Sequence, residues 1–332
     1  MNKILLEPIK KNLESLKKIP KRIGIGLSGG LDSTMLSLAM SNVAKLYNIQ
    51  VYLLHINHSI QIDSDLWAKN AKNFAKLLKY KFLEVKVDIN INKGSCLEEA
   101  AREYRYLAFK HLSIKHDINT IFLAHHRDDQ AETILLRLLR GTGVTGSIAM
   151  RECSIKDNIV YIRPWLNIDK KIILENSKYI INNKKIILSE DPMNYSTNYT
   201  RSAIRVLISP ILNKKWHGWQ KNLTRFSKNM EEALEILNSV AQDDLNLLDF
   251  NTNDYSFSLE KWRHLSQSRR NLLIRHWLNI QNIMMPSRAR LLNLNKQLMN
   301  LHNLGYDRFM VVKHEDVEIC CTRNRIFIRS IK

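Results

Sequence analysis

A short glycine-rich segment has the composition of an anion-binding loop. It lies between an apolar run and a segment with helical spacing, and it reads Ser28-Gly29-Gly30-Leu31-Asp32-Ser33. Adjacent glycines allow positive φ angles and let backbone N–H groups converge on an anion, while the following helix adds its positive dipole end. The hydroxyls of Ser28 and Ser33 are further donors. These residues predict a phosphate-binding loop.

Asp32 indicates that this loop binds phosphate together with a metal ion. A carboxylate beside a phosphate needs a cation between them, and Mg²⁺ commonly takes this position. The loop is not a Walker A motif, because no Gly-Lys-Ser/Thr sequence follows it. The alternative is an ordinary glycine-rich turn with a Ser or Asp helix cap, which accounts for less of the Ser-Gly-Gly-x-Asp-Ser pattern.

A second polar cluster follows the apolar run at residues 120–124 and reads HHRDDQAET from His125. Asp129 and Glu132 are three residues apart, so their carboxylates share one face of a helix and suit an ammonium group or a second metal ion. His125 stands at the strand end, where it could act as an acid–base group or stabilise charge. Asp128 and Asp129 could instead cap the helix and complement its dipole.

The elements that hold these residues alternate between strand-like and helix-like patterns. Apolar runs at 23–27, 51–56, 82–87 and 120–124 predict strands, and the segments 32–45, 64–78, 97–112 and 128–140 predict helices. Short strands joined by helices form right-handed βαβ units, so we predict an α/β fold with a parallel sheet. Both polar clusters follow strands, at the edge where such sheets bind ligands.

The pattern changes near residues 205–215, which predicts a domain boundary. Residues 211–249 are expected to be mostly helical, and further helices are predicted at 259–278 and 288–301. Short strands follow at 309–312, 317–320 and 325–328. We therefore predict two domains, an α/β domain at 1–210 and a helical region with a small β-containing tail at 211–332.

The charge is strongly positive, with 51 Lys and Arg against 32 Asp and Glu, a net charge of +19 and a pI of about 9.7. This excess indicates polyphosphate, nucleic acid or an anionic membrane surface as a partner, although lysine-rich composition can also reflect codon bias. No apolar run approaches the roughly 18 residues of a membrane-spanning helix, and the N-terminus lacks a signal core. The four cysteines form no C-x-x-C pair. We expect a reduced, cytoplasmic protein.

The motifs together resemble the tRNA(Ile)-lysidine synthetase family of N-type ATP pyrophosphatases. SGGLDS is similar to the pyrophosphatase loop of that superfamily, and HHRDDQAETILLRLLRGTGVTGSIAM, at 125–150, resembles the lysidine synthetases in particular. Residues 55–58, 97–106, 163–166, 190–194 and 201–205 also match, so the resemblance covers about 20–212. Ser59-Ile60-Gln61 and Met193 depart from the family pattern. Thiolation enzymes of the superfamily would need paired cysteines, and this sequence lacks them, so the thiolation class is disfavoured.

The resemblance implies a two-step ligation by an ATP pyrophosphatase catalytic domain at 1–210 and a tRNA-binding region at 211–332. ATP would adenylate the C2 oxygen of the wobble cytidine in a tRNA(Ile) with a CAU anticodon, releasing pyrophosphate. The ε-amine of free L-lysine would then displace AMP and form lysidine. Codon reading would change from AUG to AUA.

The resemblance also assigns roles to residues of this chain. Residues 28–33 would hold the pyrophosphate end of ATP, and Asp32 would hold Mg²⁺. Arg102 and His125 would offset charge that develops on adenylation and AMP departure. Asp129 and Glu132 would bind the lysine ammonium group.

Three further arginines are candidates for phosphate contacts with ATP or tRNA: Arg105, Arg201 and Arg205. Arg105 lies one helical turn after Arg102 and could face the cleft with it, or pair with Glu98 or Glu99. Arg201 and Arg205 share a helix face, and Arg201 could instead belong to a solvated basic surface.

The second half mixes basic and aromatic residues. Lys214 and Lys215 precede Trp216, and such interleaving could track an RNA backbone and stack a base. Alternatively, Trp216, Trp219, Leu223 and Phe226 form a buried helix stripe, which leaves the lysines to face RNA. Six arginines extend this basic surface, at positions 263, 269, 270, 275, 288 and 290. The sequence leaves open whether the chain is a monomer or a homodimer.

Overall fold

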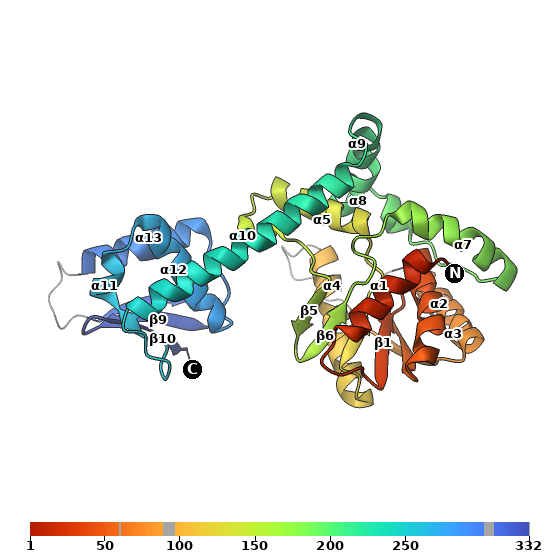
Figure 1. Cartoon of the computed structure of the whole chain (residues 1–332), viewed down its shortest axis with the longest axis horizontal. Coiled ribbons are helices and arrows are strands. Elements are labelled where there is room, and N and C mark those ends of the chain that lie inside the picture. The colour runs from red at the N-terminus through yellow and green to blue at the C-terminus, as the bar shows by residue number, and fades with distance from the viewer. Residues whose placement is uncertain (60, 89–96, 302–308, 332) are drawn as a thin grey trace. The chain divides into compact units, whose positions relative to one another are not determined.

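The computed structural model describes residues 1–59, 61–88, 97–301 and 309–331, drawn as ribbons in Figure 1. By packing, the chain divides into two units, Met1–Met230 and Glu231–Lys332. This division lies after the predicted domain boundary at residues 210 and 211. The long helix α10 (Trp219–Leu247) contains it.

A six-stranded sheet of order β3-β2-β1-β4-β6-β5 forms the centre of the first unit. Five strands are parallel: β1 (Arg22–Gly26), β2 (Gln50–Asn57), β3 (Lys81–Lys86), β4 (Thr120–Phe122) and β6 (Ile159–Ile162). β5 (Cys153–Lys156) pairs antiparallel with β6. The four predicted strands and the predicted parallel α/β sheet are confirmed.

The β5–β6 hairpin is absent from the sequence-based prediction. Its turn is Asp157-Asn158, with φ angles of 53° and 61°. Two consecutive positive φ angles at Asp and Asn are typical of a two-residue hairpin turn, so this dipeptide directly before the apolar run at 159–162 is the signal that could have revealed the hairpin.

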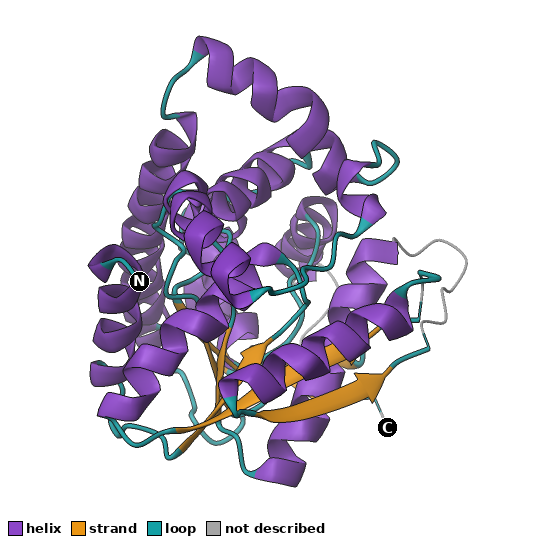
Figure 2. Cartoon of the chain, turned by 90° about the vertical axis from the view of Figure 1, so that its right-hand side faces the viewer, coloured by secondary structure: helices purple, strands orange, loops and turns teal. Residues whose placement is uncertain are grey.

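Helices cover both faces of the sheet, as Figure 2 shows for the chain coloured by element type. On one face, α1 (Lys3–Glu14), α2 (Leu31–Leu46), α3 (Ser64–Leu78) and α7 (Lys170–Lys184) contribute to one apolar core. On the other face, α4 (Leu97–His116) packs in a second core. The helices predicted within α2, α3 and α4 are confirmed.

Alternation along β1 supplies one residue set to each core. Ile23 and Ile25 are fully buried in the first core, while Gly26 lies on the face of α4. A Cβ atom at Gly26 would lie 2.9 Å from Leu123 Cδ2 and 3.1 Å from Phe109 Cζ. A side chain at position 26 would therefore force Leu123 and Phe109 to shift, so glycine lets α4 pack closely on the sheet.

The order of strands reverses between β1 and β4. The chain proceeds from β1 through β2 to β3, then returns to form β4 on the other side of β1. The segments after β1 and β4 lead into α2 and α5 (Arg127–Leu139), respectively. Ligands bind at such reversal points in α/β sheets, because the two connecting segments diverge there. Both predicted polar clusters occupy this point.

Short helices complete the first unit. α6 (Val144–Ser147) lies between α5 and β5. After α7 come the 3₁₀ helix η1 (Pro192–Tyr195), α8 (Thr200–Ala203), the π-helical turn η2 (Ile204–Ile208) and α9 (Ser209–Lys215). The prediction of a mostly helical segment from 211 is confirmed.

The predicted aromatic stripe is wrong at Trp216. A turn at Gly218, with φ +77°, separates α9 from α10, so Trp216 and Trp219 do not lie on one continuous helix. Trp219 is 6% exposed, whereas Trp216 is 58% exposed.

The second unit has its own core and a four-stranded antiparallel sheet of order β7-β10-β9-β8. The strands are β7 (Phe257–Ser258), β8 (Met310–His314), β9 (Val317–Thr322) and β10 (Arg325–Ser330). The helices are α11 (Leu259–Arg263), α12 (Gln267–Ile280) and α13 (Arg288–Asn300). The single helix predicted at 259–278 is in fact two, because Ser266 caps a new helix by accepting from the Arg269 N–H.

Two of the arginines predicted to form a basic surface have structural contacts. Arg269 Nε donates to the buried carboxylate of Asp244 at 2.8 Å, and Arg263 Nη2 donates to the Leu298 carbonyl at 2.8 Å. Arg269 still lies on the surface, where its side chain is 50% exposed, but its charge is paired with Asp244. Arg263 is only partly exposed. Within the described ranges, no helix is long and apolar enough to cross a membrane.

Candidate active site

A cavity of about 440 Å³ lies at the carboxyl ends of β1, β2 and β4. Residues from both predicted polar clusters line it, among them Ser28, Asp32, His125 and Asp129. His58 and Arg105 also line this cavity. The fold therefore brings together residues that are about a hundred positions apart in the sequence.

The phosphate loop (residues 28–33) is held by its own hydroxyls and by a later segment. Ser33 Oγ donates to the Gly30 carbonyl at 3.1 Å and lies 3.0 Å from Ser28 Oγ. Gly29 has φ +88°, and its carbonyl accepts from the Ser189 N–H at 2.9 Å. A Cβ at Gly29 would lie 2.8 Å from Ser189 Oγ, so only glycine fits at this position.

Asp32 lies in the first turn of α2, and its two carboxylate oxygens have different surroundings. Its Oδ2 lies 3.5 Å from His126 Nε2. Its Oδ1 is buried and has no hydrogen-bond partner among the residues that the structure describes. A buried carboxylate oxygen without a donor is costly unless a cation or donor reaches it. Asp32 therefore fits a ligand of Mg²⁺ in a site completed by phosphate oxygens and water.

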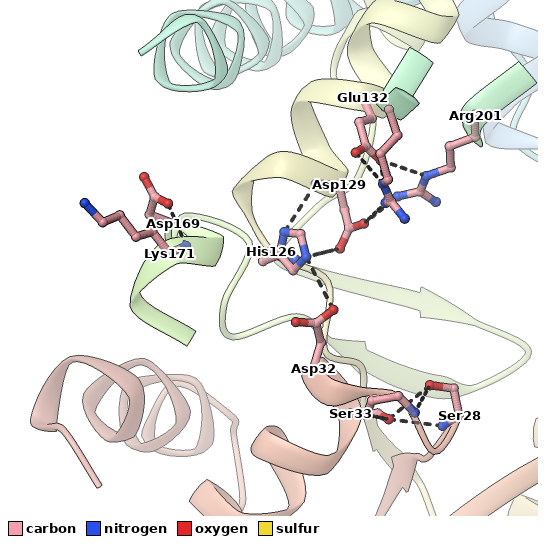
Figure 3. A network of polar contacts seen from close by, with 11 residues as sticks. Ser28, Asp32, Ser33, His126, Asp129, Glu132, Asp169, Lys171 and Arg201 are labelled. Atoms are coloured by element: carbon pink, nitrogen blue, oxygen red, sulfur yellow. Dashed lines mark hydrogen bonds and ion pairs between the residues drawn. The ribbon is translucent and has the colours of Figure 1, made fainter. Parts of the chain in front are cut away.

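His126 connects the two clusters, and the sequence analysis missed it. The side chain is 1% exposed, and its Nε2 lies 3.4 Å from Asp129 Oδ2 as well as 3.5 Å from Asp32. Figure 3 shows Asp32, His126 and Asp129 in a row between the phosphate loop and Arg201. Although burial lowers it, the carboxylates of Asp129 and Asp32 raise the pKa of His126 above 6.5.

His126 also begins α5 as its N-cap. Its Nδ1 accepts from the Asp129 N–H at 3.4 Å, and the Asp129 carboxylate accepts from the His126 N–H at 3.1 Å. The alternative role in capping is thus confirmed for Asp129, whereas Asp128 lies in the first turn of α5, where it complements the helix dipole without taking part in the cap. A polar residue followed by an acid three positions later at the start of a helix is the spacing that could have revealed this cap.

Asp129 and Glu132 are both paired with arginines. Arg205 donates to Glu132 through Nε at 2.8 Å and through Nη2 at 2.7 Å. Arg201 Nη2 donates to Asp129 Oδ1 at 2.8 Å, and Arg201 Nε donates to Glu132 at 3.3 Å. The shared face predicted for Arg201 and Arg205 is confirmed, and the alternative of a solvated surface is wrong for Arg201.

The two paired carboxylates differ in their position relative to the cavity. Glu132 is 3% exposed and does not line the cavity, whereas Asp129 does. Despite burial, His126 and Arg201 hold the pKa of Asp129 well below its usual value. Burial lowers the pKa of Arg205, but its bonds to Glu132 outweigh this and raise the pKa. Asp129 and Arg205 are therefore charged at neutral pH.

Two histidines and an arginine, His58, His125 and Arg105, form another part of the cavity wall. Burial, together with Arg163, Arg201 and Arg105, lowers the pKa of His125 well below 6.5, although Asp129 acts in the opposite direction. His125 is therefore uncharged at neutral pH, and its buried Nδ1 has no hydrogen-bond partner in the described part of the chain. Burial and Arg105 lower the pKa of His58 to about 4.

The remaining predicted residues lie outside this cavity. Arg102 is exposed on α4, with its Cζ 5.6 Å from the centre of the Tyr106 ring. Lys214 and Lys215 are exposed in the last turn of α9. The Glu98 alternative for Arg105 involves a side chain outside the described residues.

Comparison with known proteins agrees with this geometry. A family model described as a PP-loop domain matches residues 2–212, and one described as a TilS substrate binding domain matches residues 257–327. A tRNA(Ile)-lysidine synthase from Bordetella parapertussis is 39% identical over 324 residues, 98% of this chain and 94% of its own length. The chain belongs to the tRNA(Ile)-lysidine synthase family. The resemblance noted in the sequence is confirmed.

Other lysidine synthases and a structural neighbour extend the comparison. A relative from Histophilus somni is 32% identical over 300 residues, 89% of this chain and 67% of its own. The solved U34-tRNA thiolase NcsA from Methanococcus maripaludis has a TM-score of 0.57 at 18% identity, covering 69% of this chain and 78% of that one. At this identity the neighbour shows a shared fold.

Proposed function

We propose that this chain joins L-lysine to C2 of the wobble cytidine in a tRNA(Ile) with a CAU anticodon, at the expense of ATP. One observation carries the proposal. A single cavity contains a phosphate loop with an unpartnered Asp32 oxygen and, on the same wall, the carboxylate of Asp129. A site for a nucleotide phosphate and a site for an ammonium group are thus adjacent, as a ligation of lysine requires.

In the first step, the phosphate loop would hold the pyrophosphate end of ATP. Bound Mg²⁺ would neutralise phosphate charge, with Asp32 as its protein ligand. The cytidine O2 would attack the α-phosphorus, the bond to the bridging oxygen would break, and pyrophosphate would leave. Arg105 lines this cavity, so it would offset the negative charge that develops. Arg102 lies one turn before it on α4 and outside the cavity, so it would add to this effect from a greater distance.

In the second step, the ε-amine of lysine would attack C2 as the C–O bond to AMP breaks. The amine must first lose a proton, and the uncharged His125 in the cavity wall would accept it. Asp129 would bind the ammonium group directly because it lines the cavity. Glu132 would hold Arg205 and Arg201 in place behind Asp129, so that both carboxylates shape the lysine site.

The arginine pairs constrain how lysine binds. Asp129 Oδ1 accepts from Arg201, so the lysine ammonium would share this carboxylate with Arg201. Phosphate contacts by Arg201 or Arg205 would require these side chains to leave the carboxylates, and both are about one-third exposed. Contacts with the tRNA would lie largely in residues 211–332, which include the range 257–327 matched by the substrate-binding family model.

A direct assay tests this function. Labelled lysine is incubated with the protein, ATP, Mg²⁺ and a tRNA(Ile) transcript bearing a CAU anticodon, and tRNA-bound label is counted. Label is expected only when ATP is present, with AMP and pyrophosphate released in equal amounts. A methionine tRNA with the same anticodon is the specificity control. Absence of label in both tRNAs would contradict the proposal.

Gly29→Ala is expected to destabilise the folded protein and to weaken ATP binding. Alanine at φ +88° is strained by about 1–3 kcal/mol, and its Cβ would also collide with Ser189. Gly141→Ala is the matched control, since Gly141 has φ +78° with no atom within 4 Å of the added Cβ. Urea unfolding and calorimetric ATP titration measure both effects. Equal losses in the two variants would show that Ser189 does not restrict the loop.

His125 is expected to make stability and activity depend on pH below neutrality. Its folded pKa lies below 6.5, so the unfolded chain binds more protons in this range, and stability falls as pH decreases from about 7. His125→Gln should show a shallower fall in melting temperature than the wild type between pH 7 and 5. The wild-type lysine-transfer rate should stay level through pH 6.5 and decline only at lower pH. A decline centred at or above 6.5 would exclude His125 as the base.

A further inference from the structure

The segment that joins the two halves of the sequence is entirely free of acidic residues. From Pro192 to Met230 there is no Asp or Glu, and the basic residues are Arg201, Arg205, Lys214, Lys215, Lys221, Arg225 and Lys228. Arg201 and Arg205 face inward to Asp129 and Glu132, as described above. The remaining five follow along α9 and the start of α10, within the first unit.

Trp216 is an exposed aromatic side chain directly beside lysines of this segment, whereas the other strongly exposed aromatic, Tyr195, lies near the start of the segment. It follows α9 directly as the C-cap residue and is 58% exposed. Its neighbours Lys214 and Lys215 are exposed, and neither has an ion pair among the described residues. The next tryptophan, Trp219, is buried, and its Nε1 donates to Asn213 Oδ1 at 2.8 Å.

The turn that carries Trp216 is anchored on both sides. The Trp216 N–H donates to the Leu212 carbonyl at 2.8 Å, and the Trp219 N–H donates to the Trp216 carbonyl at 3.1 Å. An indole on an anchored backbone loses little entropy when a planar group stacks on it. An exposed indole beside unpaired lysines is the arrangement that proteins use to bind single-stranded nucleic acid.

We propose that Trp216 stacks on an unpaired base of the tRNA while Lys214 and Lys215 contact the phosphates on either side of it. Lys221 and Arg225 in the first turns of α10 extend the same basic surface. Because the segment contains no acidic residue, it favours a polyanion over a protein as its partner. The exposed surface of α9 also includes the apolar side chain of Ile211. Stacking requires a base outside a helix, so the contact would lie in a loop of the tRNA.

This inference rests on the proposed function, because it takes tRNA as the substrate. Its test uses the full chain and a tRNA(Ile) transcript, with binding measured by filter retention at several salt concentrations. Trp216→Ala is expected to raise Kd about 5- to 150-fold, and Trp216→Phe is expected to raise it less. Tyr179→Ala removes an aromatic ring that is 76% exposed on α7 and should leave Kd unchanged.

Two further measurements separate stacking from charge. Lys214→Ala with Lys215→Ala should reduce the salt dependence of log Kd by about 1.4, whereas Trp216→Ala should leave this slope unchanged. A fully paired RNA duplex should bind the wild type and Trp216→Ala equally. Lysine transfer at saturating tRNA should be unchanged in Trp216→Ala, with a raised KM for tRNA.

The outcomes are distinct for the two proposals. An unchanged Kd for tRNA in Trp216→Ala would overturn the stacking contact, and an equal loss on the duplex would show that Trp216 serves a structural role instead. If the wild type binds tRNA in a Trp216-dependent manner but transfers no lysine, the proposed function fails and this contact stands.

Discussion

Asp32→Asn is expected to reduce lysine incorporation by about two to three orders of magnitude, with tRNA binding unchanged. Asparagine keeps the shape of the side chain but removes the negative charge that would hold Mg²⁺ against the phosphate loop. It also replaces one of two carboxylates that face His126. The measurement is the rate of labelled lysine transfer at saturating ATP, together with the Mg²⁺ concentration required for half the maximal rate.

Asp65→Asn provides the matched control for Asp32→Asn. Asp65 also lies in the first turn of a helix, α3, and accepts from Lys86 Nζ at 2.7 Å on the surface. This control should retain full lysine transfer and an unaltered Mg²⁺ requirement. If Asp32→Asn kept more than about a tenth of the wild-type rate, the catalytic role of Asp32 would be wrong.

Glu132→Gln is expected to impair both stability and the second chemical step. It leaves Arg205 and Arg201 with a neutral partner at a buried position. Breaking a buried ion pair costs about 3–5 kcal/mol, and the loss here should be nearer 1–3 kcal/mol because both arginines reach solvent and glutamine keeps one acceptor. Urea unfolding measures this loss. Lysine transfer should fall by at least about tenfold, whereas lysine-independent pyrophosphate release should persist.

The double variant Glu132→Gln with Arg205→Gln separates the two effects. Removing both charges should recover part of the lost stability, because no buried charge remains without its partner. Lysine transfer should stay low in the double variant, since Asp129 and Arg201 would still lack their support. Full recovery of transfer would show that Glu132 has no role in the lysine site beyond stability.

Much of the nucleotide half of the site follows from local sequence patterns. Gly29, Gly30 and Asp32 sit directly between an apolar run and a helical repeat, so their place at a strand–helix turn depends on neighbouring residues alone. Likewise, Asp129 and Glu132 share a face because of helical spacing. These features needed no knowledge of distant contacts.

Other features depend on the position of one segment against another. Arg201 and Arg205 have the spacing of one helix face, but their partners lie about 70 residues earlier on α5. Trp216 fits a buried helical stripe until the turn at Gly218 is known, and it then proves to be exposed. Arg269 could belong to a basic surface, yet it binds the buried Asp244.

The sequence by itself therefore determined the parallel α/β fold, the phosphate loop, the acidic helix and membership of the lysidine synthase family. Periodicity and short motifs encode these features, because each arises from residues within a few positions of one another. Only the tertiary structure decided that His126 joins Asp32 to Asp129, that arginines neutralise the acidic pair, and that Trp216 is exposed on a basic surface. The contact of His126 with Asp32 depends on the reversal of strand order, the arginine pairs on the packing of α8 and η2 against α5, and the exposure of Trp216 on the turn at Gly218. Charge, size and spacing along one segment do not specify its partner.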